Sequence, residues 1–355
     1  MTRPAVLAVD GGGSKTDVLL ADATGRLLAH ARGRGTNPQM IGIELAMSRI
    51  QALVEEAGRQ CGLAPGNGPV AGHAGVYLAG VDLPLEVEQV EQRVQAAGWA
   101  PTHVVDNDVF ALLRAGTSNP DAVAVICGTG INCVGVRRDG ATSRFPSLGP
   151  ISGDWGGGGH LGEKALWWAA RSEDGRADPS SLSAAVAGHF GLPTVMAVGE
   201  ALHFGRLDEH RLAELTPLVF AEAAAGDWAA VKLVDRLALE IAGMATVSLR
   251  RLSLLAAKAD VVLGGGVLRA GHADLLADIE RRIRTEAPDV TLRVVTDAPV
   301  VGAVLLALDH VGAGPEAEAT ARTATTAWLQ RTLTPPPEPA TVRTAPPGGG
   351  GSPAR

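Results

Sequence analysis

The sequence predicts an α/β protein made of two related domains. Two features of its 355 residues lead to this prediction. Residues 6–118 have the pattern of three strands followed by helix, strand, helix and strand, and from residue 121 a strand with a glycine-rich first turn begins the pattern again. A chain of this length exceeds one typical domain, so the repetition indicates two copies of one structural unit.

The first expected element is a β-hairpin over residues 6–20. An apolar run breaks at Asp10 and resumes after Thr16, too soon for a helix to intervene. Glycines without Cβ let a phosphate approach the backbone N–H groups, and the polar side chains add donors and one positive charge. Asp10 is placed to hold a hydrated Mg²⁺ through its waters. The residues expected to bind phosphate are Gly11, Gly12, Gly13, Ser14, Lys15 and Thr16.

An ordinary glycine-rich turn would have the same local sequence, so the surroundings of the loop matter. The spacing of a Walker loop is absent, and a strand follows where Walker and Rossmann loops require a helix. The segment resembles the hairpin phosphate loop of the superfamily of acetate kinase, sugar kinases, heat-shock chaperone ATPases and actin. That resemblance implies ribonuclease-H-like domains, a second glycine-rich hairpin, and a later glycine-rich loop for adenosine.

The rest of the first domain follows this pattern. Residues 26–33 are expected to form a third strand, and Asn37 directly precedes a proline at which a helix to about residue 60 begins. The next elements are a strand at 75–79, a helix at 86–97, a strand at 103–105 that ends at Asp106, and a helix at 109–114.

The second hairpin is expected where the pattern begins again. Strands at 122–127 and 131–136 flank the loop Gly128, Thr129, Gly130, which we expect to bind phosphate. Residues 145–159 hold Asp154, Trp155 and four further glycines before a helix at 160–170; these residue types favour a site loop over a flexible linker.

The remainder is expected to be mostly helical from residue 180 to 257, with weak breaks at residues 191–193 and 226–227 and with Asp227 as the N-cap of the last helix. A buried strand then leads into Gly264, Gly265 and Gly266, the loop expected to bind adenosine, and helices follow at 272–285 and 299–310 around a strand at 292–295. The expected domains are residues 1–118 completed by a helix at about 300–312, and residues 119–299 with a helical insertion. Residues 317–329 suit a peripheral helix, and the proline- and glycine-rich residues 331–355 suit a disordered tail.

Composition narrows the functional classes. A net charge of -7 and the lack of any Lys/Arg run argue against a nucleic-acid partner. No apolar run is long enough to cross a membrane, and the apolar run that ends at Asp10 is too short for a signal peptide. Cys61, Cys127 and Cys133 are odd in number and scattered, so we expect no disulfide framework and a cytoplasmic location. The oligomeric state stays open between monomer and homodimer.

The ordered set of motifs resembles the BadF/BadG/BcrA/BcrD-type ATPase family and, within it, the N-acetylglucosamine kinases. The matching pieces run in family order over about residues 5 to 312: residues 10–16, Thr36 and Asn37, Ile41 and Gly42, Asp106, residues 128–130 with Asn132 and Cys133, Gly153 and Asp154, residues 264–266, and Gly302 with Ala303. The resemblance implies a small-molecule sugar substrate, ATP and Mg²⁺.

By the same resemblance, Asp106 is the expected catalytic base on the sugar 6-hydroxyl. Asp108 is the alternative, and two ordinary helix-capping acids would also fit the sequence. The resemblance also implies that Asn37, Asn132 and Asp154 hold sugar hydroxyls.

Three departures from the family pattern put the identity of the sugar in question. Pro38, Gln39 and Met40 stand where an aromatic residue usually helps to contain the acetamide, Ala79 and Gly80 where a serine is typical, and Trp155 where a glutamate follows the aspartate.

The leading hypothesis is therefore an ATP-dependent amino-sugar kinase. An activator ATPase that couples hydrolysis to electron transfer through a shared iron-sulfur cluster is the second hypothesis, and it would need exposed cysteines. A sugar sensor without turnover is the third. It is disfavoured by the acidic charge and by the lack of a helix-turn-helix segment before residue 6.

Overall fold

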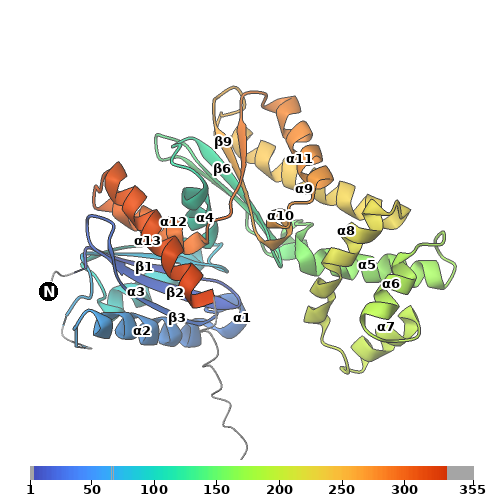
Figure 1. The fold of residues 1–355 in the computed structure, drawn as a ribbon, viewed down its shortest axis with the longest axis horizontal. Helices are drawn as coiled ribbons and strands as arrows, with labels where there is room; N and C mark the ends of the chain where they lie inside the picture. Colours follow the sequence, from blue (N-terminus) through green and yellow to red (C-terminus); the bar gives the residue numbers. More distant parts are fainter. Residues whose placement is uncertain (1–3, 65, 67, 334–355) are drawn as a thin grey trace, which may run out of the picture.

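The computed structural model describes residues 4–64, 66 and 68–333, which form two lobes, each built on a five-stranded sheet (Figure 1). The first sheet has the order β3-β2-β1-β4-β5 and the second the order β10-β9-β6-β7-β8. The strands of the first sheet are β1 (Val6–Gly11), β2 (Lys15–Ala21), β3 (Leu27–Arg34), β4 (His73–Leu78) and β5 (Thr102–Asn107). Those of the second are β6 (Ala122–Cys127), β7 (Ile131–Val136), β8 (Thr142–Arg144), β9 (Asp260–Gly264) and β10 (Thr291–Val294).

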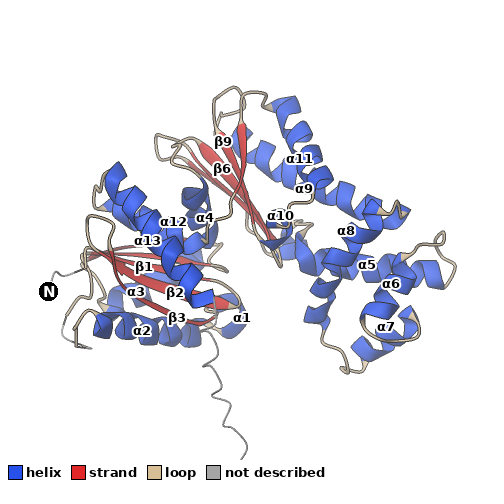
Figure 2. Ribbon diagram, in the orientation of Figure 1, coloured by secondary structure: helices blue, strands red, loops and turns tan. Residues whose placement is uncertain are grey.

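The two sheets have the same topology. In each, the first strand of the lobe is central: it pairs antiparallel with the second strand, through the glycine hairpin, and parallel with the fourth. All six residues of β1 are buried, as expected for a central strand with helices on both faces (Figure 2). The predicted fold class, two ribonuclease-H-like units in one α/β chain, is confirmed.

Helices cover both faces of the first sheet. One face carries α2 (Ile43–Gln60), whose buried positions include Met47, Ile50 and Val54, and the other carries α12 (Pro299–His310), which packs on β1 and β4 after the chain returns from the second lobe. The remaining helices of this lobe are α1 (Pro38–Ile41), α3 (Pro84–Ala97) and α4 (Asp108–Gly116).

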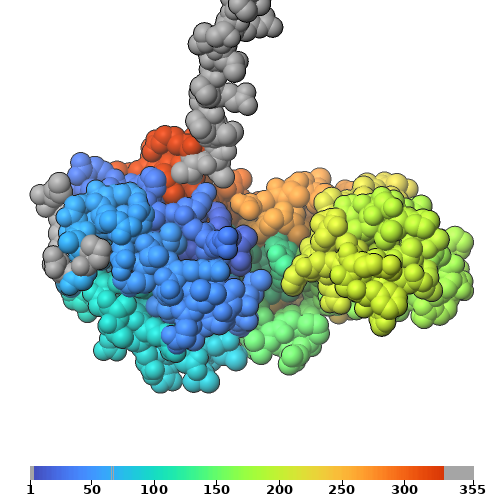
Figure 3. Space-filling view, turned by 90° about the horizontal axis from the view of Figure 1, so that it is seen from below, coloured from blue at the N-terminus to red at the C-terminus, as the bar shows by residue number. Residues whose placement is uncertain are grey.

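The second lobe carries the helical insertion, which projects from the body of the molecule in yellow-green (Figure 3). The helical region expected over residues 180–257 consists of α6 (Leu182–His189), α7 (Val195–His203), the 3-10 helix η2 (Glu209–Leu215), α8 (Thr216–Ala224) and α9 (Trp228–Arg251), and the helices are interrupted at both expected places, residues 191–193 and 226–227. Asp227 caps α9 as expected, since its Oδ1 accepts from the N–H groups of Ala229 and Ala230. The lobe also contains the 3-10 helix η1 (Gly149–Ser152) and the helices α5 (Gly157–Glu173), α10 (Gly266–Arg269) and α11 (Ala273–Glu286).

The last helix, α13 (Pro315–Leu333), is longer and more deeply packed than the peripheral helix expected over residues 317–329. Trp328 on this helix is 1% exposed, and its ring lies 4.5 Å from that of His30 on β3. The first residues of the tail expected from residue 331 are therefore helical, and residues 334–355 lie outside the described part of the chain. The helix was underestimated because its burial depends on a surface formed by distant strands.

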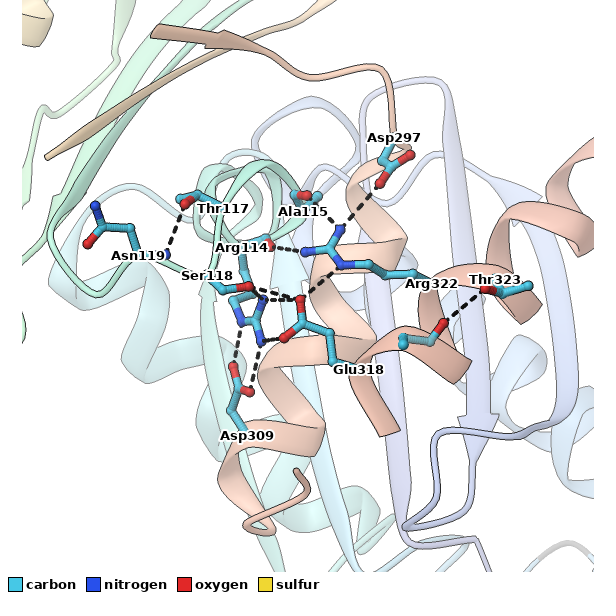
Figure 4. Close-up of polar contacts among 11 residues, drawn as sticks. Arg114, Ala115, Thr117, Ser118, Asn119, Asp297, Asp309, Glu318, Arg322 and Thr323 are labelled. Atoms are coloured by element: carbon cyan, nitrogen blue, oxygen red, sulfur yellow. Dashed lines mark hydrogen bonds and ion pairs between the residues drawn. The ribbon is translucent and has the colours of Figure 1, made fainter. Parts of the chain in front are cut away.

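An ion-pair network ties α13 to both connections between the lobes (Figure 4). Arg322 donates to the carbonyl oxygens of Arg114 and Ala115 at the end of α4, where the chain leaves the first lobe, and to Asp297, where it returns. Glu318 accepts from Arg114 and from Ser118. These contacts attach α13 to both chain segments that join the two lobes.

Among residues 4–64, 66 and 68–333, no helix is long and apolar enough to cross a membrane.

The fold contains a histidine whose burial gives a testable pH dependence. His73 on β4 is 1% exposed, its ring stacks on that of His310 at 3.7 Å, and Nδ1 lies 3.0 Å from the hydroxyl of Thr102. Burial and the neighbouring imidazoles of His310 and His103 lower the pKa of His73 to about 4. In the unfolded chain the imidazole regains its ordinary pKa of about 6.5 and binds the proton more readily.

Stability contributed by neutral His73 is therefore complete above pH 6.5 and is lost as the pH falls from 6.5 towards 4. At pH 5 we expect a loss of about 2 kcal/mol in the free energy of unfolding that His73→Gln largely removes. Urea unfolding at pH 7.5 and 5.0 measures it, with exposed His210→Gln as the control. An equal pH dependence in wild type and His73→Gln would contradict the assignment.

Candidate active site between the two lobes

The first glycine hairpin is formed as expected, with its tip exposed. Gly12, Gly13 and Ser14 connect β1 to β2, and the N–H of Gly12 donates to the carbonyl of Lys15 at 2.9 Å. A second segment supports the loop, since Gly35 donates to the carbonyl of Ser14. Because Gly13, Ser14 and Lys15 are exposed, this loop offers backbone N–H groups and a hydroxyl to an anion.

Two expected phosphate ligands in this hairpin have other partners in the structure. The hydroxyl of Thr16 is buried, where it donates to the carbonyl of Arg34 at 2.9 Å and lies 2.8 Å from the hydroxyl of Thr36. The ammonium of Lys15 lies 3.4 Å from the buried carboxylate of Asp17. The side chain of Thr16 therefore braces the hairpin from inside, whereas the half-exposed Lys15 can still reach a ligand.

The glycine-rich loops of the second lobe converge on one another. Gly265 has a φ of +90° and sits so close to the backbone of Cys127 that a Cβ there would overlap its carbonyl group. The loop of Gly128, Thr129 and Gly130 therefore lies beside the loop of Gly264, Gly265 and Gly266.

The run of four glycines at the start of α5 has a structural function at the same place. The N–H groups of Gly158 and Gly159 donate to the carbonyls of Gly128 and Thr129 at 2.7 and 3.0 Å. Any side chain at Gly157 would overlap the backbone of Thr129 and Gly130. The helix therefore begins at Gly157, earlier than the expected residue 160, because glycines let its first turn pack on the turn between β6 and β7.

Three carboxylates gather at the carboxyl ends of the strands of the first lobe. Asp10 ends β1, Asp82 follows β4, and Asp108 follows β5 and begins α4. Burial, together with the charges of Asp108 and Asp17, raises the pKa of Asp10 to about 8. Burial raises the pKa of Asp108 to about 6, and burial with the charges of Glu86 and Asp108 raises that of Asp82 to about 7. Such a group of acids is typical of a site that binds a cation or moves a proton.

Asp82 connects the polar side chains of both lobes. Its Oδ1 accepts from Asn107 Nδ2 at 2.8 Å and from Asn132 Nδ2, in the second lobe, at 3.0 Å. Its Oδ2 accepts from Gln39 Nε2 at 3.2 Å, and the same nitrogen donates to Glu86 Oε1 at 2.9 Å. The expected sugar ligand Asn132 is thus brought to the acids of the first lobe.

The remaining expected sugar ligands lie in structured loops. Asn37 caps α1, with its Oδ1 accepting from the N–H of Gln39, and a Cβ at Gly80 would overlap its side chain. Asp154 Oδ2 accepts from the N–H of Gly149 and from the hydroxyl of Ser152. Asp154 lines a cavity of about 230 Å³ together with Thr129, Gly130 and His160.

Asp106, the expected catalytic base, has a partner that the sequence did not predict. Its two carboxylate oxygens accept from Nη1 and Nη2 of Arg144 at 2.6 and 2.7 Å, which is the two-bond geometry of an arginine–carboxylate pair. Arg144 comes from β8 of the second lobe, and its guanidinium also lies over the ring of Phe110 on α4. The pair joins the edge strands of the two sheets.

We expect Arg144 and Asp106 to be energetically coupled across the lobes. In a double-mutant cycle with Arg144→Ala and Asp106→Asn, the coupling in the free energy of unfolding should be about 1 kcal/mol, because the partly exposed pair is screened by solvent. Arg144→Lys should keep less than half of it, since lysine cannot form both bonds. The exposed pair of Arg137 and Asp139 within one hairpin is the control, with coupling near zero. Additive effects at Arg144 and Asp106 would contradict the link.

Sequence reasoning missed Asp82, Asn107 and Arg144. Asp82 had a usable signal: it follows a buried parallel strand next to β1, at the edge of the sheet where Asp10 lies. Asn107 is adjacent to two residues that were considered. Arg144 had no signal, because its contact crosses from one lobe to the other.

Comparison with known proteins shows which proteins this chain resembles. Over 319 residues the chain is 25% identical to N-acetyl-D-glucosamine kinase of Dictyostelium discoideum, covering 87% of this chain and 99% of that protein. It is 24% identical over 303 residues to N-acetylmuramic acid/N-acetylglucosamine kinase of Clostridium acetobutylicum, covering 85% and 97%. A solved structure from Chromobacterium violaceum, provisionally assigned as an N-acetylglucosamine kinase, superposes with a TM-score of 0.63 at 23% identity, covering 86% and 99%.

Two lobes of one topology, each with a glycine hairpin after its central strand, define the actin-like class of α/β proteins. The chain belongs to the BadF/BadG/BcrA/BcrD ATPase family, whose model matches residues 7–307.

Proposed function

We propose that this protein is an ATP-dependent kinase that phosphorylates the 6-hydroxyl of an amino sugar. The observation that carries the proposal is the cross-lobe cluster in which Asp82 accepts from Asn107 and Asn132, beside the carboxylates of Asp10 and Asp108. It combines what phosphoryl transfer needs: backbone donors for phosphate, carboxylates for a cation and a base, and amides for sugar hydroxyls.

In this proposal the glycine hairpins hold the phosphates of ATP, and Gly264, Gly265 and Gly266 lie against the adenosine. Asp10 would hold Mg²⁺ through its water ligands. The pKa of Asp10, raised to about 8, fits this role, because a buried carboxylate beside a second acid is stabilised by a cation. Mg²⁺ supplies charge neutralisation on the phosphates when bound.

Of the two candidates for the base, the geometry favours Asp108. Asp106 uses both oxygens on Arg144, so proton uptake there would first break a two-bond ion pair. Asp108 begins α4 with no ion pair recorded among the described residues, and burial raises its pKa to about 6, closer to working pH. A base of that pKa is well suited to take the proton of a sugar hydroxyl.

The sugar would bind through Asn37, Asn132 and Asp154, with Asp82, which contacts Asn132, as a further partner. In the relatives' family pattern an aromatic residue helps to contain the acetamide; here Gln39 occupies that stretch and donates to Asp82 and Glu86. Carboxylates at this position would also suit the ammonium of an unacetylated amino sugar. We place N-acetylglucosamine first because of the relatives named above, and glucosamine second because of these carboxylates.

A coupled kinase assay tests the proposal. Purified protein with MgATP is offered N-acetylglucosamine, glucosamine, N-acetylmannosamine and glucose, and we expect an amino sugar to give the highest kcat/KM. Gln39→Trp should raise the preference for the acetylated sugar, because it restores an aromatic wall. Absence of sugar-dependent ADP release across the panel would reject the kinase assignment.

The activator ATPase of the sequence-based hypotheses is disfavoured by the cysteines. Cys127 and Cys133 are buried in the second hairpin, where burial raises the pKa of each thiol to about 12. Such thiols do not reach a cluster shared between subunits. A chromophore after anaerobic purification would favour the activator function instead.

We propose a cytoplasmic location, which the free state of Cys61, Cys127 and Cys133 supports, and either a monomeric or a homodimeric state.

A further inference from the structure

Most tryptophans of this chain are gathered in one place next to the proposed active site. Four of the six lie where α5, the loop before it and the start of α9 meet: Trp155, Trp167, Trp168 and Trp228. The ring of Trp168 contacts those of Trp167 and Trp228 edge to face, at centroid distances of 4.5 and 5.0 Å. Trp155, Trp168 and Trp228 are half-buried and pack with one side against the core of the second lobe, whereas Trp167 is 47% exposed.

A pocket of about 330 Å³ opens among these rings, and its charged lining residues are all cationic. Lys164, Lys232 and Arg236 line it, and its other lining residues are apolar or aromatic: Leu233, Trp155, Trp167 and Trp168. Two of the chain's four lysines therefore face one pocket of a protein whose net charge is -7. We call this the tryptophan pocket.

The cations of the tryptophan pocket are only partly compensated. The ammonium of Lys232 lies 5.0 Å from the ring of Trp228 and 5.6 Å from that of Trp168, and Arg236 lies over Trp155 and pairs with Glu240. Within the described residues, neither Lys164 nor Lys232 forms an ion pair. A cation over an exposed indole ring is stabilised less than it would be by a charge-assisted hydrogen bond to an anion.

The pocket also borders the proposed active site. Trp155 directly follows Asp154, and its ring lies 5.1 Å from that of His160, which lines the 230 Å³ cavity with Asp154. Lys164 follows His160 by one helical turn on α5. A molecule in the tryptophan pocket would therefore contact the loop that carries Asp154.

We propose that the tryptophan pocket is a second, non-catalytic binding site for a small anionic sugar, a hexose or hexosamine bearing a phosphate. Indole faces suit the apolar face of a pyranose ring, and the two lysines suit a phosphate as point charges. The choice of a phosphorylated sugar rests on the proposed function, whose product has this chemistry. Occupation of the pocket would then restrain the Asp154 loop and slow turnover as product accumulates.

The test uses the full chain and its tryptophan fluorescence, confirmed by calorimetry. The probes are glucosamine 6-phosphate, glucose 6-phosphate, glucosamine and inorganic phosphate. We expect the sugar phosphates to bind, and Lys232→Glu or Trp167→Ala to weaken that binding at least tenfold without changing initial kcat. Lys258→Gln, a lysine outside the pocket, should leave binding unchanged.

The experiment distinguishes failure of the second binding site from failure of the proposed kinase function. Unchanged sugar-phosphate binding in both pocket variants would overturn the site, as would equally tight binding of inorganic phosphate alone. A change of oligomeric state in the variants, measured by light scattering, would instead assign this face to a second copy of the chain and overturn the proposal. Lysine-dependent binding without any sugar-dependent turnover would keep the site and reject the kinase.

Discussion

Asp108→Asn is expected to lower kcat by about 10²–10⁴-fold, the usual contribution of a positioned general base. The asparagine keeps the size and the helix-starting position of the side chain on α4 but cannot take a proton. ATP affinity should change little, because the phosphates are expected to lie on the glycine hairpins. Steady-state kinetics with the best sugar and equilibrium binding of ATP measure the two quantities.

Asp106→Asn is the matched control, two residues before Asp108 and near the end of β5. It weakens the pair with Arg144 but leaves the carboxylate of Asp108, so we expect a loss of kcat of about tenfold or less. The sequence-based expectation is the reverse, with Asp106 as the base. Near-normal turnover in Asp108→Asn together with a collapse in Asp106→Asn would restore that assignment.

Gly302→Ala is expected to destabilise the protein by about 3 kcal/mol or more. Gly302 lies on α12 where this helix crosses α4, and a Cβ there would overlap the carbonyl oxygen of Ala111. The methyl group has no room unless the two helices separate, which costs more than ordinary overpacking because backbone is involved. Urea unfolding and the melting temperature measure the loss.

The same substitution at Gly199 separates this packing effect from helix propensity. Gly199 lies within α7, has no atom within 4 Å of its ideal Cβ, and has an ordinary helical conformation. Gly199→Ala should therefore stabilise by about 0.5–1 kcal/mol. If Gly302→Ala were as stable as wild type, the close crossing of α4 and α12 would be wrong.

The sequence predicted what depends on local pattern. The two glycine hairpins, the strand into Gly264 and the cap at Asp227 all follow from residue types and spacing, and the structure has each of them. The order of the motifs also predicted the fold class, because the second hairpin after residue 121 repeats the opening of the first lobe.

The parts that could not be predicted are contacts between distant segments. The partner of Asp106 lies 38 residues away on the other lobe, and the hydroxyl of Thr16 is occupied by Thr36 on a neighbouring segment. The depth of Trp328 depends on β3, almost the whole chain away. Local pattern places a polar residue at the end of a strand but does not say which side chain meets it there.

The attachment of α13 to both lobe connections decides where this protein can be joined to another. A fluorescent reporter added after residue 333 leaves Arg322 and Glu318 in place, so the two lobes keep their native relation. A shortened chain that stops at Gly312 loses the contacts of Arg322 and Glu318 together. We expect its lobes to move more freely, which small-angle scattering would detect as a larger radius of gyration relative to chain length. Through these contacts α13 restrains how far the two lobes can move relative to one another.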